Sequence, residues 1–485
     1  MLVRALILLS LMITLSSSSF LFSGYFQSQI KTNQVSEATL AYALAYQLPA
    51  AELYQFEQSE RGSLAWLAIA HRLVEQGNHD VSFSLGEYYL TSGKKELGIE
   101  LLKQAAKSKH LLATQYLANY YYENGQYKEA NFLIDDVLIA KSQPLAILKI
   151  KSLMAIGELS ELNRFVPKLN HHEKSRKFLE LLDKYNVLQT SPQNTKITSC
   201  PLSITLVAGT FEGLQHFETL AKQYKQGVLN DYLCIERIRY LPSYSESCSR
   251  TSNANQPISC DESFWQQYAS EIKSTYLGVM LPKGGANVNY GILYIDRYDD
   301  INVFNHEVTH LLGFVDEYEL SSQHKVCNEE AFDIGYNIAV IEQHLTEQHE
   351  YSYSVPISKV KQLPWFHMLD ASLVLGKQQL VLNQAYAKSG VGIFLAETCQ
   401  QNTKHMAIKP LNKRTLLRNH DVKLPTEYIE MLEAVPKMYS MPSFHFNISL
   451  EYLRLNDLDN ANYWLNKTQM HYSAEKIEKI LTRGY

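Results

Sequence analysis

The segment HEVTHLLGFVDEY, residues 306–318 of this 485-residue chain, gives the strongest indication of its fold. His306 and His310 stand four residues apart, and on a helix this spacing places both imidazoles on one face. Gly313 follows, at a position where glycine can take the left-handed conformation that ends a helix and turns the chain back. That turn would direct Asp316 toward the two imidazoles. The segment therefore predicts a helix, a sharp turn and a cluster of three ligating side chains.

These residue types suit a hydrolytic zinc centre. Two neutral imidazoles and one carboxylate can hold a zinc ion and leave its fourth position open to water. Zinc polarises a peptide carbonyl and acidifies the bound water, and Glu307, next to His306, would take the proton from that water. The segment thus predicts one Zn²⁺ per chain and hydrolysis of peptide bonds.

HEVTHLLGFVD resembles the motif of the metzincin peptidases, HExxHxxGxx followed by His or, in some members, Asp. The resemblance implies that His306, His310 and Asp316 are the metal ligands, that Glu307 is the general base and that Gly313 is the turn residue. The continuation DEY is similar to peptidases related to bacterial IgA-cleaving enzymes, as are PWFHML at 364–369 and GIFLAETC at 392–399.

Metzincins also place a methionine on a tight turn below the metal. The resemblance makes Met406, in the polar stretch CQQNTKHMAIKP, the first candidate for this residue. Met368 is the second candidate.

The sequence leaves other ligand sets open. Glu329, 19 residues after His310, resembles the glutamate that completes the site in the other large HExxH group. Gly313 favours Asp316, because that second group usually continues its helix past the second histidine. Glu317 is a third option. Tyr318 could hydrogen-bond the reaction intermediate, although a tyrosine here could equally pack in the core.

Composition narrows the class of protein. Apolar residues make up 46% of the chain and charged residues 20%, with a net charge of -5. This is globular composition, and it lacks the basic surplus that phosphate backbones attract, so nucleic acid is not an expected partner. The length predicts two or three domains.

The N-terminus predicts export. Arg4 precedes an apolar run from Ala5 to Leu15 and then small residues, which is the layout of a signal peptide over residues 1–24. The protein would then be periplasmic or secreted. An uncleaved membrane anchor from Ala5 to Phe26 is the alternative, and only in that case is the membrane a partner.

An even number of cysteines in an exported chain suggests disulfides. Spacing does not choose among the possible pairings; we favour Cys248 with Cys260, and Cys327 with Cys399. Buried free thiols are the alternative. All the cysteines lie in the middle of the chain: Cys200, Cys234, Cys248, Cys260, Cys327 and Cys399.

Residues 25–190 contain an internal repeat. The pattern Leu85-Gly86-x-Tyr88-Tyr89 returns 32 residues later at Leu117-Ala118-x-Tyr120-Tyr121, a period typical of helix-pair arrays. Small residues such as Gly86 and Gly98 would let neighbouring helices approach closely. The pattern resembles tetratricopeptide arrays, and a similar unit recurs at residues 447–465.

Residues 190–201 (TSPQNTKITSCP) are interpreted as a linker, and strand-like and helix-like patterns mix from 199 to 415. The run GILYI is expected to feed the metal-binding helix and to offer an exposed edge to an extended substrate. The segments ITLVAG, LCIERIRYL, YLGVMLP and GILYI are predicted strands, and SFWQQYASEI is a predicted helix.

The predicted fold class is therefore multidomain: an α-helical repeat (solenoid) domain, an α+β, metzincin-like zinc peptidase domain, and a helical, repeat-like segment at 420–485. The expected function is that of an exported zinc-dependent endopeptidase acting on a peptide or protein, with a further protein partner recruited by the repeats. The alternative is a helical-repeat binding scaffold whose metal domain is structural or inactive. A fourth protein ligand such as Cys327, closing the metal site, would favour that alternative.

Overall fold

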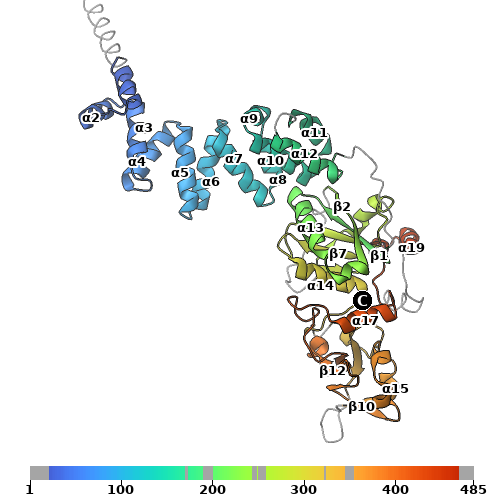
Figure 1. The fold of residues 1–485 in the computed structure, drawn as a ribbon. Coiled ribbons are helices and arrows are strands. Elements are labelled where there is room, and N and C mark those ends of the chain that lie inside the picture. The colour runs from blue at the N-terminus through green and yellow to red at the C-terminus, as the bar shows by residue number, and fades with distance from the viewer. Residues whose placement is uncertain are drawn as a thin grey trace, which may run out of the picture. The chain divides into compact units, whose positions relative to one another are not determined.

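The computed structural model describes residues 21–169, 173–188, 200–242, 248–249, 258–321, 324–343 and 354–468. Its contacts divide the chain into two compact units between Leu153 and Met154. The first unit is helical and the second mixes helices with small sheets (Figure 1), which agrees with a helical domain and an α/β domain. Most of the predicted signal segment and most of the predicted linker at 190–201 lie outside the described residues.

In the helical unit, from residue 37 to residue 133, each helix packs against the next one along the chain. Gly86 of α5 and Gly98 of α6 face each other so closely that a Cβ on Gly98 would lie 2.8 Å from the Gly86 carbonyl oxygen. The small residues therefore allow the close approach that was predicted for them. The helices are α2 (Glu37–Ala45), α3 (Pro49–Gln58), α4 (Leu64–Glu75), α5 (His79–Thr91), α6 (Lys95–Lys107), α7 (Leu111–Glu123), α8 (Tyr127–Leu133), α9 (Asp136–Lys141) and α10 (Gln143–Ile156), which crosses into the second unit.

The repeat in the sequence corresponds to the helix bounds. Helices α5 and α7 have the same length and are offset by the 32-residue period, and α6 and α8 begin with the same offset. Leu85 of α5 and Leu117 of α7 occupy equivalent positions and are both buried. The period therefore marks a helix pair, as the sequence pattern indicated.

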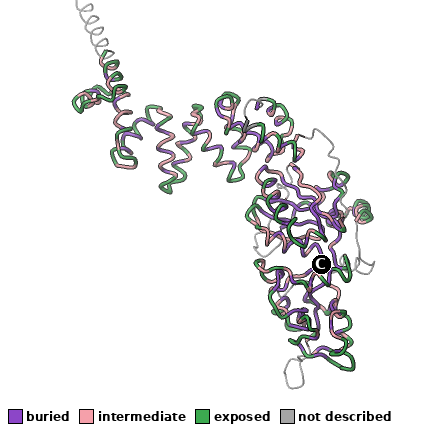
Figure 2. The backbone as a smooth tube through the Cα atoms, viewed as in Figure 1, coloured by how far each residue is buried: buried purple, intermediate pink, exposed green. Residues whose placement is uncertain are grey.

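The second unit begins with α11 (Leu159–Phe165) and α12 (Glu173–Lys184) and contains a five-stranded sheet with the order β2-β1-β5-β7-β6. The first four strands in this order run parallel and β6 is antiparallel to β7. All four predicted strands are present, and most of their residues are buried, in agreement with the purple segments in the α/β part of Figure 2. The strands are β1 (Leu202–Ala208), β2 (Leu233–Tyr240), β5 (Tyr276–Leu281), β6 (Asn287–Asn289) and β7 (Ile292–Asp296).

Two details differ from expectation. The GILYI run forms β7, which lies between β5 and β6, so its edge is not exposed; β6 is the edge strand. Strand β6 has only the three residues Asn287–Asn289, two of them polar, and so short a run does not predict a strand from the sequence. The predicted helix at 263–272 is instead a 3-10 helix, Glu262–Tyr268.

A second, four-stranded sheet has the order β11-β12-β13-β8 and is antiparallel in each pair. It follows helix α14 (Ile301–Leu312) in the chain, and short helices and a two-stranded sheet adjoin it. These elements are β8 (Ala339–Glu342), β9 (Ser354–Pro356), α15 (Ile357–Val360), α16 (Ala371–Val374), β10 (Gln379–Val381), β11 (Gln384–Ala385), β12 (Gly392–Ala396) and β13 (His405–Lys409).

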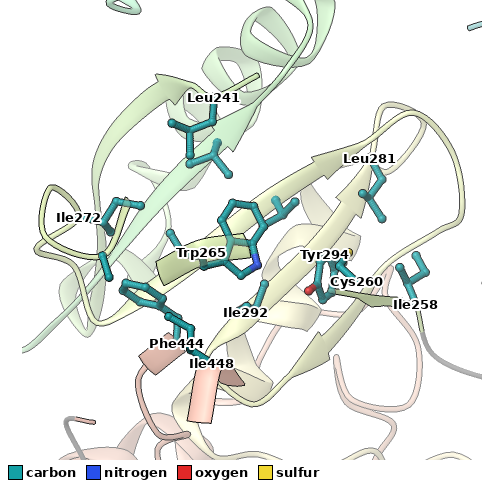
Figure 3. Close-up of a cluster of buried hydrophobic side chains, with 14 residues drawn as sticks. Leu241, Ile258, Cys260, Trp265, Ile272, Leu281, Ile292, Tyr294, Phe444 and Ile448 are labelled. Atoms are coloured by element: carbon teal, nitrogen blue, oxygen red, sulfur yellow. The ribbon is translucent and has the colours of Figure 1, made fainter. Parts of the chain in front are cut away.

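The predicted C-terminal segment is helical, and it contributes to the core of the α/β fold. Phe444 and Ile448 of α18 pack with Trp265 and with Ile292 of β7 in one buried cluster (Figure 3). Residues 469–485 of the predicted segment lie outside the described residues. The C-terminal helices are α17 (Thr426–Ala434), α18 (Phe444–Arg454) and α19 (Leu458–Lys467).

Three disulfides lie in the second unit. The favoured pairs Cys248–Cys260 and Cys327–Cys399 are confirmed, and Cys200 bonds to Cys234. Within the described part of the chain, no helix is long and apolar enough to cross a membrane.

Candidate metal centre

The helix that carries the motif is α14, Ile301–Leu312, and the residues that flank it explain where it begins and ends. Asp300 caps the N-terminus by accepting hydrogen bonds from the backbone N–H groups of Asn302 (2.9 Å) and Val303 (3.1 Å). Gly313 ends the helix with φ 104, in the left-handed region predicted for it. The buried face of α14, which includes Phe304 and Val308, fixes the helix in the core.

Gly313 also lies so close to the backbone of Tyr439 that a larger side chain would not fit. A Cβ there would lie 2.4 Å from the backbone carbonyl atoms of Tyr439. We expect Gly313→Ala to destabilise the protein by more than the about 1–2 kcal/mol that left-handed strain alone costs. Gly376→Ala is the matched control, since Gly376 has φ +82 and open space around its Cα. Urea unfolding of both variants checks this, and equal losses of stability would contradict it.

The three predicted ligands meet at one point. The Nε2 atoms of His306 and His310 are 3.1 Å apart, and Asp316 Oδ1 lies 3.2 Å from the first and 3.3 Å from the second. His306 is 2% exposed, whereas the side chains of His310 and Asp316 are 15% and 18% exposed. Among the described residues, these three form the group of side chains whose ligand atoms lie close enough together to hold one metal ion.

Backbone carbonyls orient both imidazoles. His306 Nδ1 donates to Leu416 O (3.0 Å) and His310 Nδ1 donates to Phe314 O (2.9 Å). In a neutral ring this arrangement keeps the proton on Nδ1 and leaves the lone pair of Nε2 free to bind a cation. Such outer hydrogen bonds are the usual way in which proteins fix a ligating histidine.

The cluster fits a small divalent cation. In a tetrahedral zinc site with metal–ligand distances of about 2.0–2.1 Å, ligand atoms stand about 3.3–3.4 Å apart. The three observed separations, 3.1, 3.2 and 3.3 Å, are close to this value. Asp316 Oδ1 is also buried without a hydrogen-bond partner. A cation would satisfy that oxygen.

The pKa shifts in the cluster also favour a bound cation. Burial opposes a charge on His310, but the Asp316 carboxylate outweighs it and raises the pKa of His310 to about 10. The pKa of Asp316 is lowered, because the two histidines outweigh its burial. A proton on His310 thus supplies the positive charge that this carboxylate needs when no ion is bound. Glu307 differs: burial raises its pKa to about 7, although His310 and His306 oppose the shift.

Glu317, the third ligand option, is engaged elsewhere. Its carboxylate accepts from Lys409 Nζ at 2.7 Å, from Asn337 Nδ2 at 3.2 Å and from the Tyr428 hydroxyl. Glu317 is 1% exposed. It therefore anchors the segment after α14 to strand β13 and helix α17 and does not face the metal position.

Glu329 and the two candidate methionines occupy other positions in the fold. Glu329 is not in the converging group of the described residues. Met406 lies inside strand β13, paired with Ile341 of β8, so the prediction that it occupies a turn was wrong. The polar residues before it resembled a turn, but cross-strand pairing determined the structure. Met368 ends a short 3-10 helix, Phe366–Met368.

The turn that reaches the metal ligands lies instead at residues 415–419. The amide N–H groups of Arg418 and Asn419 both donate to Thr415 O, at 3.0 and 2.9 Å. Leu416 O accepts from His306, and Leu417 O accepts from the Glu317 amide at 3.0 Å. This turn carries leucines and no methionine, so the expectation of a methionine does not lead to it.

Two further side chains border the ligands. The Tyr318 ring lies 6.4 Å from the His306 ring, and burial and the nearby Asp316 carboxylate raise the pKa of Tyr318. The His420 ring lies 4.3 Å from the His306 ring, and burial and His306 lower the pKa of His420. Sequence analysis missed His420 because it follows the predicted domain end at residue 415.

His420, whose ring lies beside that of His306, lines an open cavity of about 490 Å³. The rest of the lining is Tyr298, Asp299, Asp300, Val303, Arg418, Asn419 and Asp421. The site thus combines three converging ligands, a buried carboxyl group beside them and a histidine that connects them to this cavity. The chain matches no protein-family model, no curated protein and no solved structure.

Proposed function

We propose that this chain is an exported zinc-dependent endopeptidase of the metzincin type. The observation that carries the proposal is the triangle of ligand atoms from His306, His310 and Asp316, whose sides have the lengths of a tetrahedral zinc site. Two imidazoles and one carboxylate are a donor set found in catalytic zinc sites, and the carboxylate oxygen here is buried without a hydrogen-bond partner. The disulfides support an oxidising, extracytoplasmic location, which is where a signal peptide would deliver the protein.

When bound, zinc supplies a Lewis acid that acidifies water and polarises a carbonyl. His306, His310 and Asp316 would hold it. Glu307 would act as the general base, accepting a proton from the attacking water and delivering it to the nitrogen of the scissile bond. Its buried carboxyl group, with a pKa near neutrality, suits both transfers.

The approach to the site suits an extended peptide. Strand β6 is the free edge of the five-stranded sheet, and α14 packs against β6 and β7. A substrate strand could pair with the backbone of β6 and place a peptide bond over the ligands. The helical unit, which we propose to be a solenoid, would recruit a protein substrate or partner; Leu64 and Phe132 there are 87% and 89% exposed.

Hydrolysis is favoured over a binding scaffold with a structural metal. Structural zinc sites usually have four protein ligands, commonly with cysteine. Cys327, the fourth ligand considered from the sequence, is bonded to Cys399 and has no thiolate to offer. In the described part of the chain the converging group has three members, which leaves a position for water.

Metal analysis tests the proposal. We expect the purified protein to contain one zinc per chain, and His306→Ala to lose it. We also expect zinc at about 100 times its dissociation constant to stabilise the wild type by about 2.7 kcal/mol, but not the variant. His367→Ala, which alters an exposed histidine, is the control. Elemental analysis and thermal unfolding give both readouts, and equal zinc content in all three proteins would refute the proposal.

A further inference from the structure

His420 lies beside the ligand His306. Its ring centroid is 4.3 Å from that of His306, at an interplanar angle of 44°. It is not part of the converging ligand group. The imidazole therefore borders the ligands without joining them.

The loop that carries His420 is tied to the ligands themselves. Leu416 O accepts a hydrogen bond from His306, and Leu417 O accepts one from the Glu317 amide. Arg418 forms an ion pair with Glu397 at 2.7 Å. Three fixed residues thus precede Asn419 and His420. A side chain on such a loop is positioned in advance, as stabilisation of a transition state requires.

His420 also faces the open side of the site. It lines the cavity of about 490 Å³ together with the residues that lead into α14. A peptide in this cavity would reach His420, which lies beside the ligand His306. The His420 side chain is half-buried, so part of it remains accessible.

Two cationic side chains near the site already have partners. Lys409 pairs with Glu317 at 2.7 Å, and Arg418 pairs with Glu397. His420 makes no hydrogen bond to any residue that the structure describes. Its ring N–H is thus available to a substrate.

We propose that His420 is a further catalytic residue, whose ring N–H donates a hydrogen bond to the carbonyl oxygen of the scissile peptide bond. This hydrogen bond strengthens as negative charge forms on the carbonyl oxygen, and His420 keeps its proton throughout. The proton of the attacking water goes to Glu307, as in the proposed function on which this inference rests. The substrate class is therefore a peptide whose carbonyl is held between the ligand cluster and His420.

The test compares His420→Ala with His420→Gln, which retains an N–H donor. Both should bind one zinc per chain, as the wild type does. With fluorescently labelled casein as substrate, we expect kcat to fall about 10²–10³-fold in His420→Ala, the loss typical of one removed oxyanion donor. His420→Gln should recover part of that activity.

A second readout does not depend on turnover. In the cobalt-substituted protein, acetohydroxamate binding can be followed by visible absorption, and His420→Ala should weaken it because the oxyanion loses a donor. Unchanged kcat and unchanged acetohydroxamate affinity in a zinc-containing His420→Ala variant would overturn the inference alone. Loss of zinc in both variants would make His420 a ligand and also overturn it. A wild type without zinc or hydrolysis would overturn the proposed function together with this inference.

Discussion

Glu307→Gln is expected to keep one zinc per chain and to lower the rate of peptide hydrolysis about 10²–10⁴-fold, the usual contribution of a general base. Glutamine has nearly the shape of glutamate, so the packing around this buried residue should survive. It has no carboxylate to accept the proton from water. Zinc content by elemental analysis and hydrolysis of labelled casein measure the two effects separately.

The control for this substitution is Glu319→Gln, an exposed carboxyl twelve residues further along the chain. It removes the same charge from the protein without touching the site, so its activity should match the wild type. Equal activity of Glu307→Gln and Glu319→Gln would show that Glu307 is not the base. Loss of zinc in Glu307→Gln would instead assign it a part in metal binding.

The proposed base also predicts a pH dependence. The carboxyl must be ionised to accept a proton, and burial raises its pKa to about 7 in the protein without an ion. A bound cation favours the ionised form, so activity should rise with pH through a midpoint below that value. The acid limb should disappear from the residual activity of Glu307→Gln.

The centre of the site could be predicted from sequence because its geometry is local. His306, Glu307 and His310 share one helix, and Gly313 turns the chain so that Asp316 returns to them within six residues. Helix periodicity and the left-handed preference of glycine are sufficient for that inference.

The remainder of the site depends on contacts that no local pattern encodes. Leu416, which orients His306, and Tyr428, which binds Glu317, follow their partners by 110 and 111 residues. His420 stands in a polar stretch with no periodicity. Likewise, the C-terminal helices were predicted from a repeat pattern, but only the structure shows Phe444 and Ile448 in the core beside Trp265.

The buried pair behind the metal ligands predicts a large loss of stability. Lys409 Nζ lies 2.7 Å from Glu317 Oε2, with side-chain exposures of 11% and 0%. The other hydrogen bond of Lys409 goes to the backbone carbonyl of Lys413 at 3.2 Å. That carbonyl is neutral, so it does not balance the charge of the ammonium group. Removing the carboxylate therefore leaves an ammonium group buried without a counter-ion. We expect Glu317→Ala to lower the free energy of unfolding by about 3–5 kcal/mol.

Glu330→Ala is the matched control, because Glu330 pairs with Lys359 at 2.6 Å in a more exposed position. Exposed pairs contribute about 0–1 kcal/mol, so this variant should remain close to the wild type in urea unfolding. The double variant Glu317→Ala/Lys409→Met should recover part of the loss, since it removes the stranded charge as well. Similar losses in Glu317→Ala and Glu330→Ala would mean that the buried pair does not hold the segment. If it does, Glu317→Ala should also weaken zinc binding, because Glu317 adjoins the ligand Asp316 in the chain.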